Sequence, residues 1–485
     1  MFEIIHKDIM GRIGKLKTPH GFIETPALMP VVNPNIELIP PKEIQKMGAQ
    51  AIITNAYIIL RTDDLREKAL RSGVQKILDV SVPVMTDSGS YQLFVYGDVE
   101  VTNKEIIEFQ HKIGSDIIVP LDIPTPPDAS RDSALKDLEI TISRVKEAKE
   151  ILNKLESESL LVAPVQGSTY LDLRKKCAET LKSLNPDVFA IGALVPLLDS
   201  YRFFEVVKII LEVKSILPSS RPVHLFGVGH PMFFSIAVAL GCDLFDSAAY
   251  ALYAKDDRYI TSHGTKKLED LRYFPCSCPI CLNHTPEELK RMDKDARSEL
   301  LAKHNLWVSF QEIKLVKQAI KEGTLFELVE RRIRSHPNLL YAWRQIRDYT
   351  NLIDKFDPSM KQVFFYLGIE SIYRPAVKRH CEKILNIELE KDSYVISTSE
   401  LISADFYLKP VFGLVPKEMI ESYPAGHAEM PPADWIEHEA MVKAVNTLIE
   451  FLKKHSNKKF IIKANKIWKR YLKNLPENTK IEWLT

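Results

Sequence analysis

The stretch VPVMTDSGSYQLFVYGDVEVTNKEIIEFQHKIGSDIIVPLDIPT, residues 82–125, contains a complete strand–helix–strand unit. Its two ends, VPVMTDSGS and DIIVPLDIPT, are short and apolar, as expected of strands that are buried on both faces of a parallel sheet. Between them, TNKEIIEFQHKIG begins with Thr102 and Glu105 at capping-box spacing and closes with Gly114, which predicts a helix. This alternation predicts a protein of the α/β class.

The same unit recurs along the first half of the chain. Segments 133–155 and 200–217 show the apolar period of three to four residues that is typical of helices. Eight apolar runs occur, at residues 27–33, 51–59, 82–90, 116–125, 160–168, 188–196, 223–231 and 244–252. Eight such runs with intervening helices predict a (β/α)8 barrel of the TIM type. An open doubly wound sheet is the alternative, but it more often has a glycine-rich phosphate turn after its first strand, and none is visible here.

Length and composition limit the other possibilities. A chain of 485 residues accommodates one large barrel and a smaller domain, and 45% hydrophobic with 27% charged residues is ordinary for a globular protein. We expect a catalytic barrel over residues 1–345, including a zinc-binding segment at 274–304, and a smaller α+β region over residues 346–485. Because no apolar run approaches the roughly 20 residues of a membrane span and the N-terminus lacks a long apolar signal core, we expect a cytoplasmic protein without a membrane partner.

Charge is unevenly distributed, although the net charge is only +1. Residues 453–485 contain ten Lys or Arg and two Glu, interleaved with aromatic and aliphatic residues. This amphipathic basic segment favours a polyanionic partner, as does a second basic stretch at 331–347. The alternative for each is a solvated helix face whose aromatic residues belong to the core. Together, the two stretches raise the expectation of a nucleic-acid partner.

Polar residues gather where the predicted strands end. They are Thr54, Asn55, Asp87, Ser88, Asp122, Gln166, Asp246 and Ser247. In a barrel these ends meet at one mouth, where catalytic residues are placed. Two carboxylates at one site can act as nucleophile and acid/base at a sugar anomeric carbon, and a further Asp with a Gln suits the edge of a planar heterocycle. The alternative for any single Asp is a cap on the following helix.

A metal-binding pattern follows the last predicted strand, in FPCSCPICLNHTPEELKRMDKDARSELLAKHN, residues 274–305. Cys276, Cys278 and Cys281 form a C-x-C-x₂-C pattern, and Thr285, Pro286 and Glu288 predict a helix start. With His304 near the end of that helical run, the set predicts one structural Zn²⁺ per chain. His284 is the alternative fourth ligand, although its place three residues after Cys281 would strain the loop. The alternative to a metal site is three buried or incidental cysteines. We expect Cys177, Cys242 and Cys381 to be lone core cysteines.

Several of these motifs, in this order, resemble those of the tRNA-guanine transglycosylases. They are TDSGSYQLFVYGDVEVT, LDIPTPPD, PVQGS, IGALVP, GVGHP, FDSAAYALYA, CSCPIC and HNL. The resemblance covers roughly the first 345 residues. It is to the archaeal branch, because IGALVP stands where the bacterial branch has paired glycines, and because RSHPNLLYAWR, IYRPAVKRH and FGLVPKEMIESYP are similar to the archaeal C-terminal extension.

The resemblance implies exchange of the guanine at position 15 in the D-arm of tRNA for 7-cyano-7-deazaguanine, an early step towards archaeosine. The family's paired catalytic aspartates fall on Asp87 and Asp246. By analogy Asp246 attacks the ribose to form a covalent intermediate and Asp87 transfers the proton, although the sequence leaves the reverse assignment open. Base recognition falls on Asp122 and Gln166, helped by Ser88 and the Gly192–Ala193 backbone. We expect Tyr91 and Phe226 to stack on the base; the alternative for either is ordinary packing in the barrel.

The resemblance also implies partners and leaves three alternative functions open. Archaeal members usually end in a PUA domain that grips tRNA; none is visible after Pro476, so we expect that module to be lost or supplied by a separate chain. A homodimer through the zinc-bearing region is expected. The alternatives are an archaeosine synthase-like paralogue, a queuine-type exchanger, and an inactive tRNA-binding subunit of a heteromeric transglycosylase.

Overall fold

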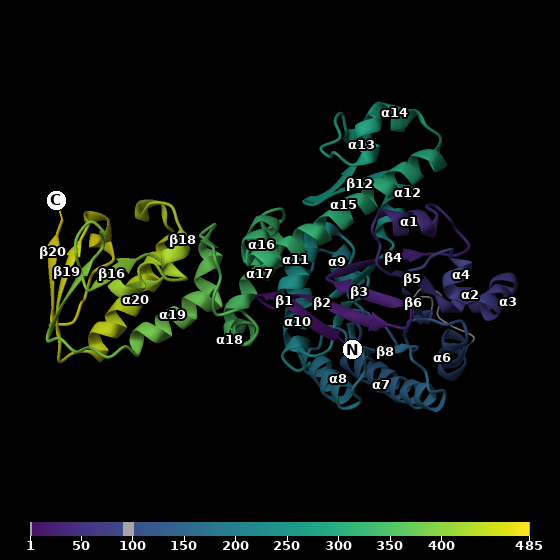
Figure 1. Cartoon of the computed structure of the whole chain (residues 1–485), viewed down its shortest axis with the longest axis horizontal. Helices are drawn as coiled ribbons and strands as arrows, with labels where there is room; N and C mark the ends of the chain where they lie inside the picture. Colours follow the sequence, from purple (N-terminus) through teal and green to yellow (C-terminus); the bar gives the residue numbers. More distant parts are fainter. Residues whose placement is uncertain (1, 91–100, 485) are drawn as a thin grey trace. The chain divides into compact units, whose positions relative to one another are not determined.

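The computed structural model describes residues 2–90 and 101–484. The chain divides into two compact units (Figure 1). Unit 1 comprises Met1–Lys321 and Arg332–Gln345, and unit 2 comprises Glu322–Arg331 and Ile346–Thr485. Among the described residues, no helix has both the length and the apolar character that crossing a membrane requires.

Unit 1 is built on a closed barrel. Within the described residues its eight strands are β4 (Ala27–Val32), β5 (Ile52–Asn55), β6 (Val84–Asp87), β7 (Ile117–Ile118), β8 (Leu160–Val165), β9 (Val188–Ile191), β10 (Val223–Leu225) and β11 (Leu244–Ser247). Neighbours pair in parallel in chain order, and β11 pairs with β4 to close the ring. Each strand lies within one of the eight predicted runs. The (β/α)8 barrel is therefore confirmed, and the open sheet is excluded.

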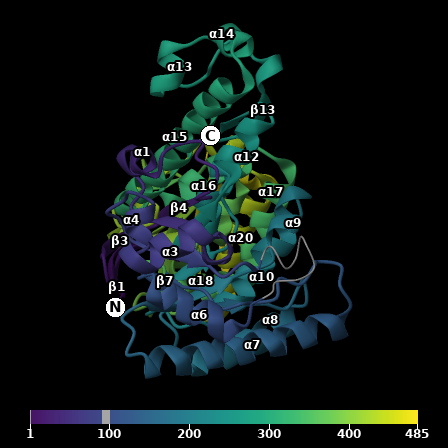
Figure 2. The same ribbon diagram turned by 90° about the vertical axis from the view of Figure 1, so that its right-hand side faces the viewer.

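Helices surround the barrel, and the views in Figures 1 and 2 show α7 and α8 packed side by side. Their bounds are α1 (Pro41–Met47), α2 (Ala56–Arg61), α3 (Asp63–Ser72), α4 (Val74–Ile77), α6 (Asn103–Lys112), α7 (Arg131–Lys154), α8 (Leu171–Ser183), α9 (Val195–Asp199), α10 (Phe203–Lys214), α11 (Pro231–Ala239) and α12 (Ala249–Lys255). The predicted capping box of α6 is confirmed, because Thr102 and Glu105 cap each other's backbone.

A three-stranded antiparallel sheet precedes the barrel and was not predicted. It consists of β1 (Phe2–Asp8), β2 (Gly11–Thr18) and β3 (Gly21–Thr25). From β2, the Arg12 guanidinium donates two hydrogen bonds to the Asp243 carboxylate, at 2.7 and 2.8 Å, and both side chains are buried. Asp243 directly precedes β11, so this ion pair fixes the sheet to the N-terminal end of the barrel, opposite the strand ends where polar residues gather.

The segment after β11 carries the cysteine-rich loop. It contains β12 (Arg258–Thr261), β13 (Gly264–Lys267), η1 (Leu268–Asp270), α13 (Pro279–Asn283), α14 (Pro286–Arg291) and α15 (Lys294–Glu322), followed by α16 (Leu325–Ile333) and α17 (Pro337–Trp343). The helix start predicted at Thr285 is confirmed by a complete capping box. That helix ends at Arg291, however, and His304 lies in the middle of the next helix, α15, rather than near the end of the first.

Unit 2 is an α+β region around a mixed five-stranded sheet in the order β17-β16-β15-β19-β20. The strands are β15 (Ser393–Ser397), β16 (Phe406–Lys409), β17 (Gly413–Pro416), β19 (Lys459–Ala464) and β20 (Thr479–Trp483), and β14 (Phe364–Phe365) pairs separately with β18 (Ala428–Glu429). The helices of this part of the chain are η2 (Arg344–Tyr349), α18 (Thr350–Asp354), η3 (Ile369–Tyr373), α19 (Pro375–Leu385), η4 (Lys417–Met419), η5 (Ala425–His427), η6 (Ala433–Trp435), α20 (His438–Lys454) and η7 (Lys466–Arg470).

The C-terminal basic segment forms strand, 3₁₀ turn and strand after its first residues complete α20, so it is not one helix face. Its aromatic residues Phe460, Trp468 and Tyr471 are buried in the core of unit 2, as the alternative interpretation of this segment expected. The lysines therefore lie on the solvent-exposed side of this segment, and its other side packs in the core of unit 2.

Candidate active site and metal centre

Four polar side chains lie at or just beyond the C-terminal ends of barrel strands, and we call Asp87, Asp122, Gln166 and Asp246 the strand-end cluster. Asp87 is the last residue of β6, Asp246 lies in β11, and Gln166 directly follows β8. Asp122 lies four residues beyond β7. In a parallel barrel all of these positions belong to one end, so residues far apart in sequence meet there.

Asp87 interacts electrostatically with two other carboxyl groups, those of Asp122 and Asp246. Its Oδ2 accepts hydrogen bonds from Asn55 Nδ2 at 3.0 Å and from the Gly89 N–H at 3.3 Å. Burial, together with the negative charges of Asp122 and Asp246, raises the pKa of Asp87 to about 7. Near neutral pH Asp87 therefore exists both with and without its proton, as a group that donates and accepts protons requires.

Asp246 is held at one oxygen. Its Oδ1 accepts from His224 Nε2 at 2.8 Å and from the Gly227 N–H at 2.9 Å. His224 is fully buried, and its Nδ1 has no partner within the described residues. Because both donors bind Oδ1, Asp246 Oδ2 carries no hydrogen bond in the described part of the chain and is available to a substrate.

Asp122 and Gln166 form a direct pair in which Gln166 Nε2 donates to Asp122 Oδ2 at 2.5 Å. Burial raises the pKa of Asp122, so this carboxyl also gains by binding donors. Gln166 is fully buried and its Oε1 has no partner among the described residues. An unpartnered buried amide oxygen is costly, so this atom is suited to accept a hydrogen bond from a ligand.

The remaining candidate residues differ in their placement. Ser88 Oγ hydrogen-bonds to Ser90 Oγ and Pro120 O, both at 3.0 Å, and Ser90 Oγ accepts from the Asp122 N–H, so Ser88 braces the Asp122 backbone. Phe226 lies edge-on to His224, with ring centroids 4.5 Å apart. Tyr91, predicted to stack on the base, lies outside the described residues.

Gly192 and Ala193 lie against Gln166. A Cβ on Gly192 would lie only 2.4 Å from Gln166 Nε2, so this position needs glycine for the amide to occupy its place. Ala193 has φ +59°, a left-handed conformation that is unusual for a residue with a side chain. Such strain is found preferentially at functional sites.

Sequence reasoning missed two partners of the aspartates. Asn55 stood out only as a strand-end residue without a role, and His224 was not singled out. His224 is the polar residue inside the apolar run VHLFGVGHP, and this anomaly was the available signal for it.

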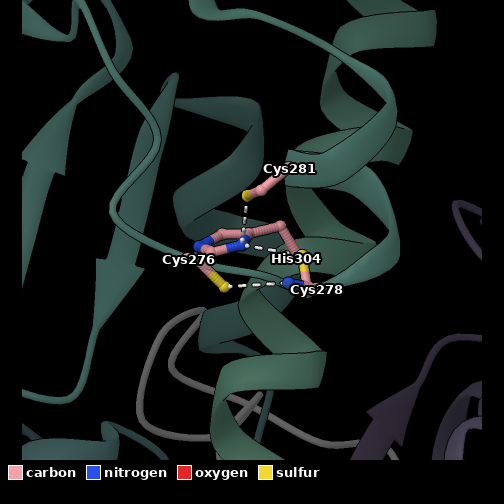
Figure 3. Close-up of side chains that lie close together, drawn as sticks. All are labelled: Cys276, Cys278, Cys281 and His304. Atoms are coloured by element: carbon pink, nitrogen blue, oxygen red, sulfur yellow. Dashed lines mark hydrogen bonds between the residues drawn. The ribbon is translucent and has the colours of Figure 1, made fainter.

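The predicted metal ligands are brought together by the loop that precedes α13, by α13 itself and by α15 (Figure 3). One ligand atom from each of Cys276, Cys278, Cys281 and His304 lies within 4.8 Å of the others, and this group can hold a metal ion. His304 Nδ1 lies 3.4 Å from Cys278 Sγ and 3.3 Å from Cys281 Sγ. The alternative ligand His284 is not part of this group.

The surroundings of His304 fit metal binding. Its Nε2 donates to Ile260 O at 2.9 Å, and this fixes the tautomer that leaves the Nδ1 lone pair directed at the sulfurs. The Tyr259 ring stacks on His304 at 3.7 Å between centroids, and the Tyr259 hydroxyl lies 3.3 Å from Cys281 Sγ. Three thiolates and one imidazole form a closed donor set of the structural kind. The three other cysteines are free, and two of them, Cys177 and Cys242, are buried.

A parallel barrel with interacting carboxylates at its C-terminal strand ends has the architecture of a barrel enzyme. The family described as queuine tRNA-ribosyltransferase matches residues 8–338 of this chain. The chain belongs to the tRNA-guanine transglycosylase family, in its archaeal branch, as the sequence motifs predicted. The assignment to an enzyme class is confirmed with it.

Relatives named tRNA-guanine(15) transglycosylase match nearly the whole chain. The protein of Archaeoglobus fulgidus is 58% identical over 484 residues, which cover 100% of this chain and 99% of the relative. That of Methanosarcina barkeri is 50% identical, covering 93% of this chain and 91% of the relative. That of Methanocaldococcus jannaschii is 49% identical, covering 93% and 72%. The similarity therefore extends through unit 2 as well as the barrel.

Proposed function

We propose that this protein exchanges the guanine at position 15 of the tRNA D-arm for 7-cyano-7-deazaguanine. The names of its relatives, tRNA-guanine(15) transglycosylase, support the site of exchange. The observation that carries the chemistry is the electrostatic interaction of Asp87 with both Asp122 and Asp246 in one strand-end cluster. This arrangement provides two carboxylates for the glycosidic bond and a third for the base.

In the proposed first step, Asp246 Oδ2 attacks C1′ of the ribose while the bond from C1′ to the guanine nitrogen breaks. The electron pair leaves with the base, and Asp87 supplies the proton that neutralises it. The product is a ribosyl–Asp246 ester. Two features support this division of roles. Asp246 is anchored through Oδ1 while its Oδ2 accepts no hydrogen bond from any described residue, and the raised pKa of Asp87 keeps a proton available near pH 7.

In the second step the deazaguanine replaces guanine at the same site. Asp87 accepts the proton from the incoming base, whose nitrogen then attacks C1′ and releases the Asp246 carboxylate. One glycosidic bond replaces another, so no oxidant, reductant or nucleoside triphosphate is consumed. Two displacements at one carbon restore the original anomer.

Asp122 and Gln166 supply base recognition in this proposal. An ionised Asp122 accepts from the ring N–H and the exocyclic amine that guanine and 7-cyano-7-deazaguanine share, and Gln166 Oε1 offers a further acceptor. Adenine lacks this donor pair and would leave the buried carboxylate unpaired, which disfavours it by a few kcal/mol. Because the target base must leave its stack to reach a barrel mouth, tRNA is remodelled on binding.

The metal in this proposal is one structural Zn²⁺ held by Cys276, Cys278, Cys281 and His304. Zinc supplies no reaction chemistry; it would fix the loop of α13 to α15. We also propose a homodimer through the same segment, because Tyr273 and Leu282 are 84% and 71% exposed there. A separate PUA-containing chain remains a proposed additional partner. Light scattering of the purified protein, alone and with Leu282→Glu, tests the dimer.

The decisive experiment incubates the protein with tRNA and radiolabelled guanine. Incorporation of label is expected from an exchanger and not from an archaeosine synthase-like paralogue or an inactive subunit. Asp246→Ala should abolish both incorporation and the RNA–protein adduct that survives denaturing electrophoresis, with zinc content unchanged. An Asp246→Ala protein that still forms the adduct would show that another residue is the nucleophile. Competition by unlabelled 7-cyano-7-deazaguanine and queuine then separates the archaeal substrate from the queuine-type alternative.

A further inference from the structure

Arg174, on α8, is a fully buried cation whose partners are all backbone carbonyls. Its Nε donates to Ser168 O at 2.8 Å, Nη1 to Val165 O at 2.6 Å and Nη2 to Gly192 O at 3.0 Å. Within the described part of the chain, no carboxylate lies within ion-pair distance of this guanidinium. A buried cation without a counter-charge is unfavourable unless its hydrogen bonds are satisfied, so the role of Arg174 is found in the carbonyls that it binds.

These carbonyls belong to the two strand ends that carry the proposed base-binding residues. Val165 is the last residue of β8 and precedes Gln166, Ser168 follows in the same turn, and Gly192 follows β9. One planar guanidinium therefore ties two neighbouring loops together. Its fixed fork of donors can hold three carbonyls at set directions, which a lysine ammonium cannot reproduce.

The bond to Gly192 O has a geometric consequence for the next residue. In a trans peptide the C=O and the following N–H point in opposite directions. Because Gly192 O accepts from Arg174, the Ala193 N–H points away from that guanidinium. Gly192 itself lies against the Gln166 amide. The Ala193 N–H donates no hydrogen bond to any described residue. It is thus an unused donor beside the proposed base-recognition pair.

The family resemblance already implies that the Gly192–Ala193 backbone helps to bind the base. We propose that Arg174 is the positioning residue that fixes this peptide, so that the Ala193 N–H donates to the 6-oxo group of the bound base. This inference rests on the proposed function, in which Asp122 binds the opposite, donor-bearing edge of the same ring. Arg174 does not touch the substrate. It determines specificity for the carbonyl at C6, whereas Asp122 determines specificity for the amine at C2.

The test compares guanine with 6-thioguanine, which keeps the ring N–H and the exocyclic amine but replaces the oxygen at C6 by a weak acceptor. Both compounds compete with labelled guanine for incorporation into tRNA, and the ratio of their inhibition constants measures recognition at C6. In Arg174→Lys we expect the KM for guanine to rise about tenfold and the preference for guanine over 6-thioguanine to fall by a similar factor. The rate of adduct formation with tRNA should fall as well, because the departing guanine presents the same 6-oxo group, but its pH dependence should be that of the wild type because Asp87 and Asp246 are not changed.

Arg12→Lys is the matched control. Arg12 is also a buried arginine, and it also donates to backbone carbonyls, of Ser219 and Arg221, but at the other end of the barrel. We expect this variant to lower Tm without changing the guanine to 6-thioguanine ratio. An Arg174→Lys protein whose two inhibition constants rise equally would show only a structural role and would overturn the inference.

A second substitution keeps the test informative if Arg174→Lys destabilises the fold. Ala193→Gly relieves the left-handed strain at φ +59° and keeps the N–H, so Arg174→Lys/Ala193→Gly should regain stability without regaining the preference for guanine. Recovery of the preference together with stability would contradict the positioning role. Wild-type incorporation of labelled guanine is measured in the same series, and its absence would overturn the proposed function itself, and this inference with it.

Discussion

Asp87 and Asp246 are the same residue type near the C-terminal ends of two barrel strands, yet their neighbours differ, as the different tasks proposed for them require. Asp87 lies among other carboxylates, which together with burial raise its pKa to about 7. Asp246 faces a buried histidine and a backbone N–H. When two carboxyl groups of one site have such different surroundings, one can act as an acid/base and the other as a nucleophile.

The rate of guanine release should therefore depend on pH through Asp87. In the proposed mechanism its protonated form is the acid for the departing base, so the single-turnover rate of adduct formation should fall as pH rises through about 7. Asp87→Asn should be slower by about 10²–10⁴-fold and should lose this dependence. Rapid-quench measurements between pH 5.5 and 8.5 provide the comparison. A variant with the wild-type pH profile would assign the titration to another group.

The same shift predicts an effect on stability. The native state binds the Asp87 proton more tightly than the unfolded chain does. This tighter binding contributes to the free energy of unfolding in full below about pH 4, and the contribution is lost as pH rises through about 7. Asp87→Asn removes the dependence. We expect it to stabilise the protein at pH 8 by about 1–3 kcal/mol, or several degrees in Tm, and to have little effect at pH 4. Calorimetry at both values tests this; an equal gain at both would exclude the linkage.

At this scale the sequence indicated the residue types of the site but not their contacts. Asp122 and Gln166 could be predicted because a polar side chain at the end of an apolar run is conspicuous. The partners of the aspartates could not, since a bond such as His224 to Asp246 joins neighbouring strands 22 residues apart. Arg174 left no signal, because an arginine on a helix is ordinarily solvent-exposed.

Among the elements, the segment with the proposed metal site gives the clearest prediction. Its helices α13 and α14 are short, so we expect the metal to hold them against α15. Cys278→Ser should reduce zinc from about one per chain to near zero, lower Tm, and open the loop around residues 273–293 to proteolysis. His284→Ala, which changes the alternative ligand, should keep the metal. Atomic absorption on both proteins decides, and loss of zinc from the His284 variant would reverse the assignment.

Elements whose apolar residues form a continuous run or recur at a regular spacing could be predicted from the sequence. Elements without such a pattern could not. The barrel strands are continuous apolar runs because both of their faces are buried. By contrast, β1 has exposed residues through most of its length, and its pairing with β2, which in turn pairs with β3, is what orders it. The C-terminal basic segment was difficult to interpret for a related reason. Lysines alternate with core residues along β19, and this spacing of two residues is that of an amphipathic strand.

For the whole molecule, charge asymmetry links unit 2 to the proposed substrate. Lys459, Lys466, Lys469 and Lys473 are exposed and form no ion pair with any described residue. Deleting the segment would not test their charge, because β19 lies between β15 and β20 and its deletion would destroy the sheet. Replacing the four lysines by alanine leaves the buried side chains in place. This variant should bind tRNA more weakly, with a salt slope shallower by about 0.7–0.9 for each phosphate that the lysines no longer neutralise.

The control for this variant removes lysines from the barrel unit instead. Lys136, Lys146 and Lys154 are exposed on α7 and are likewise without ion pairs among the described residues. Replacing these three lysines by alanine changes the net charge by a comparable amount. An effect of net charge alone would therefore make the salt slope of tRNA binding shallower in both variants. Filter binding of tRNA between 50 and 300 mM salt separates the two cases. If the unit 2 variant retains the wild-type slope, the basic segment does not bind the phosphate backbone, and tRNA affinity must come from elsewhere in the chain.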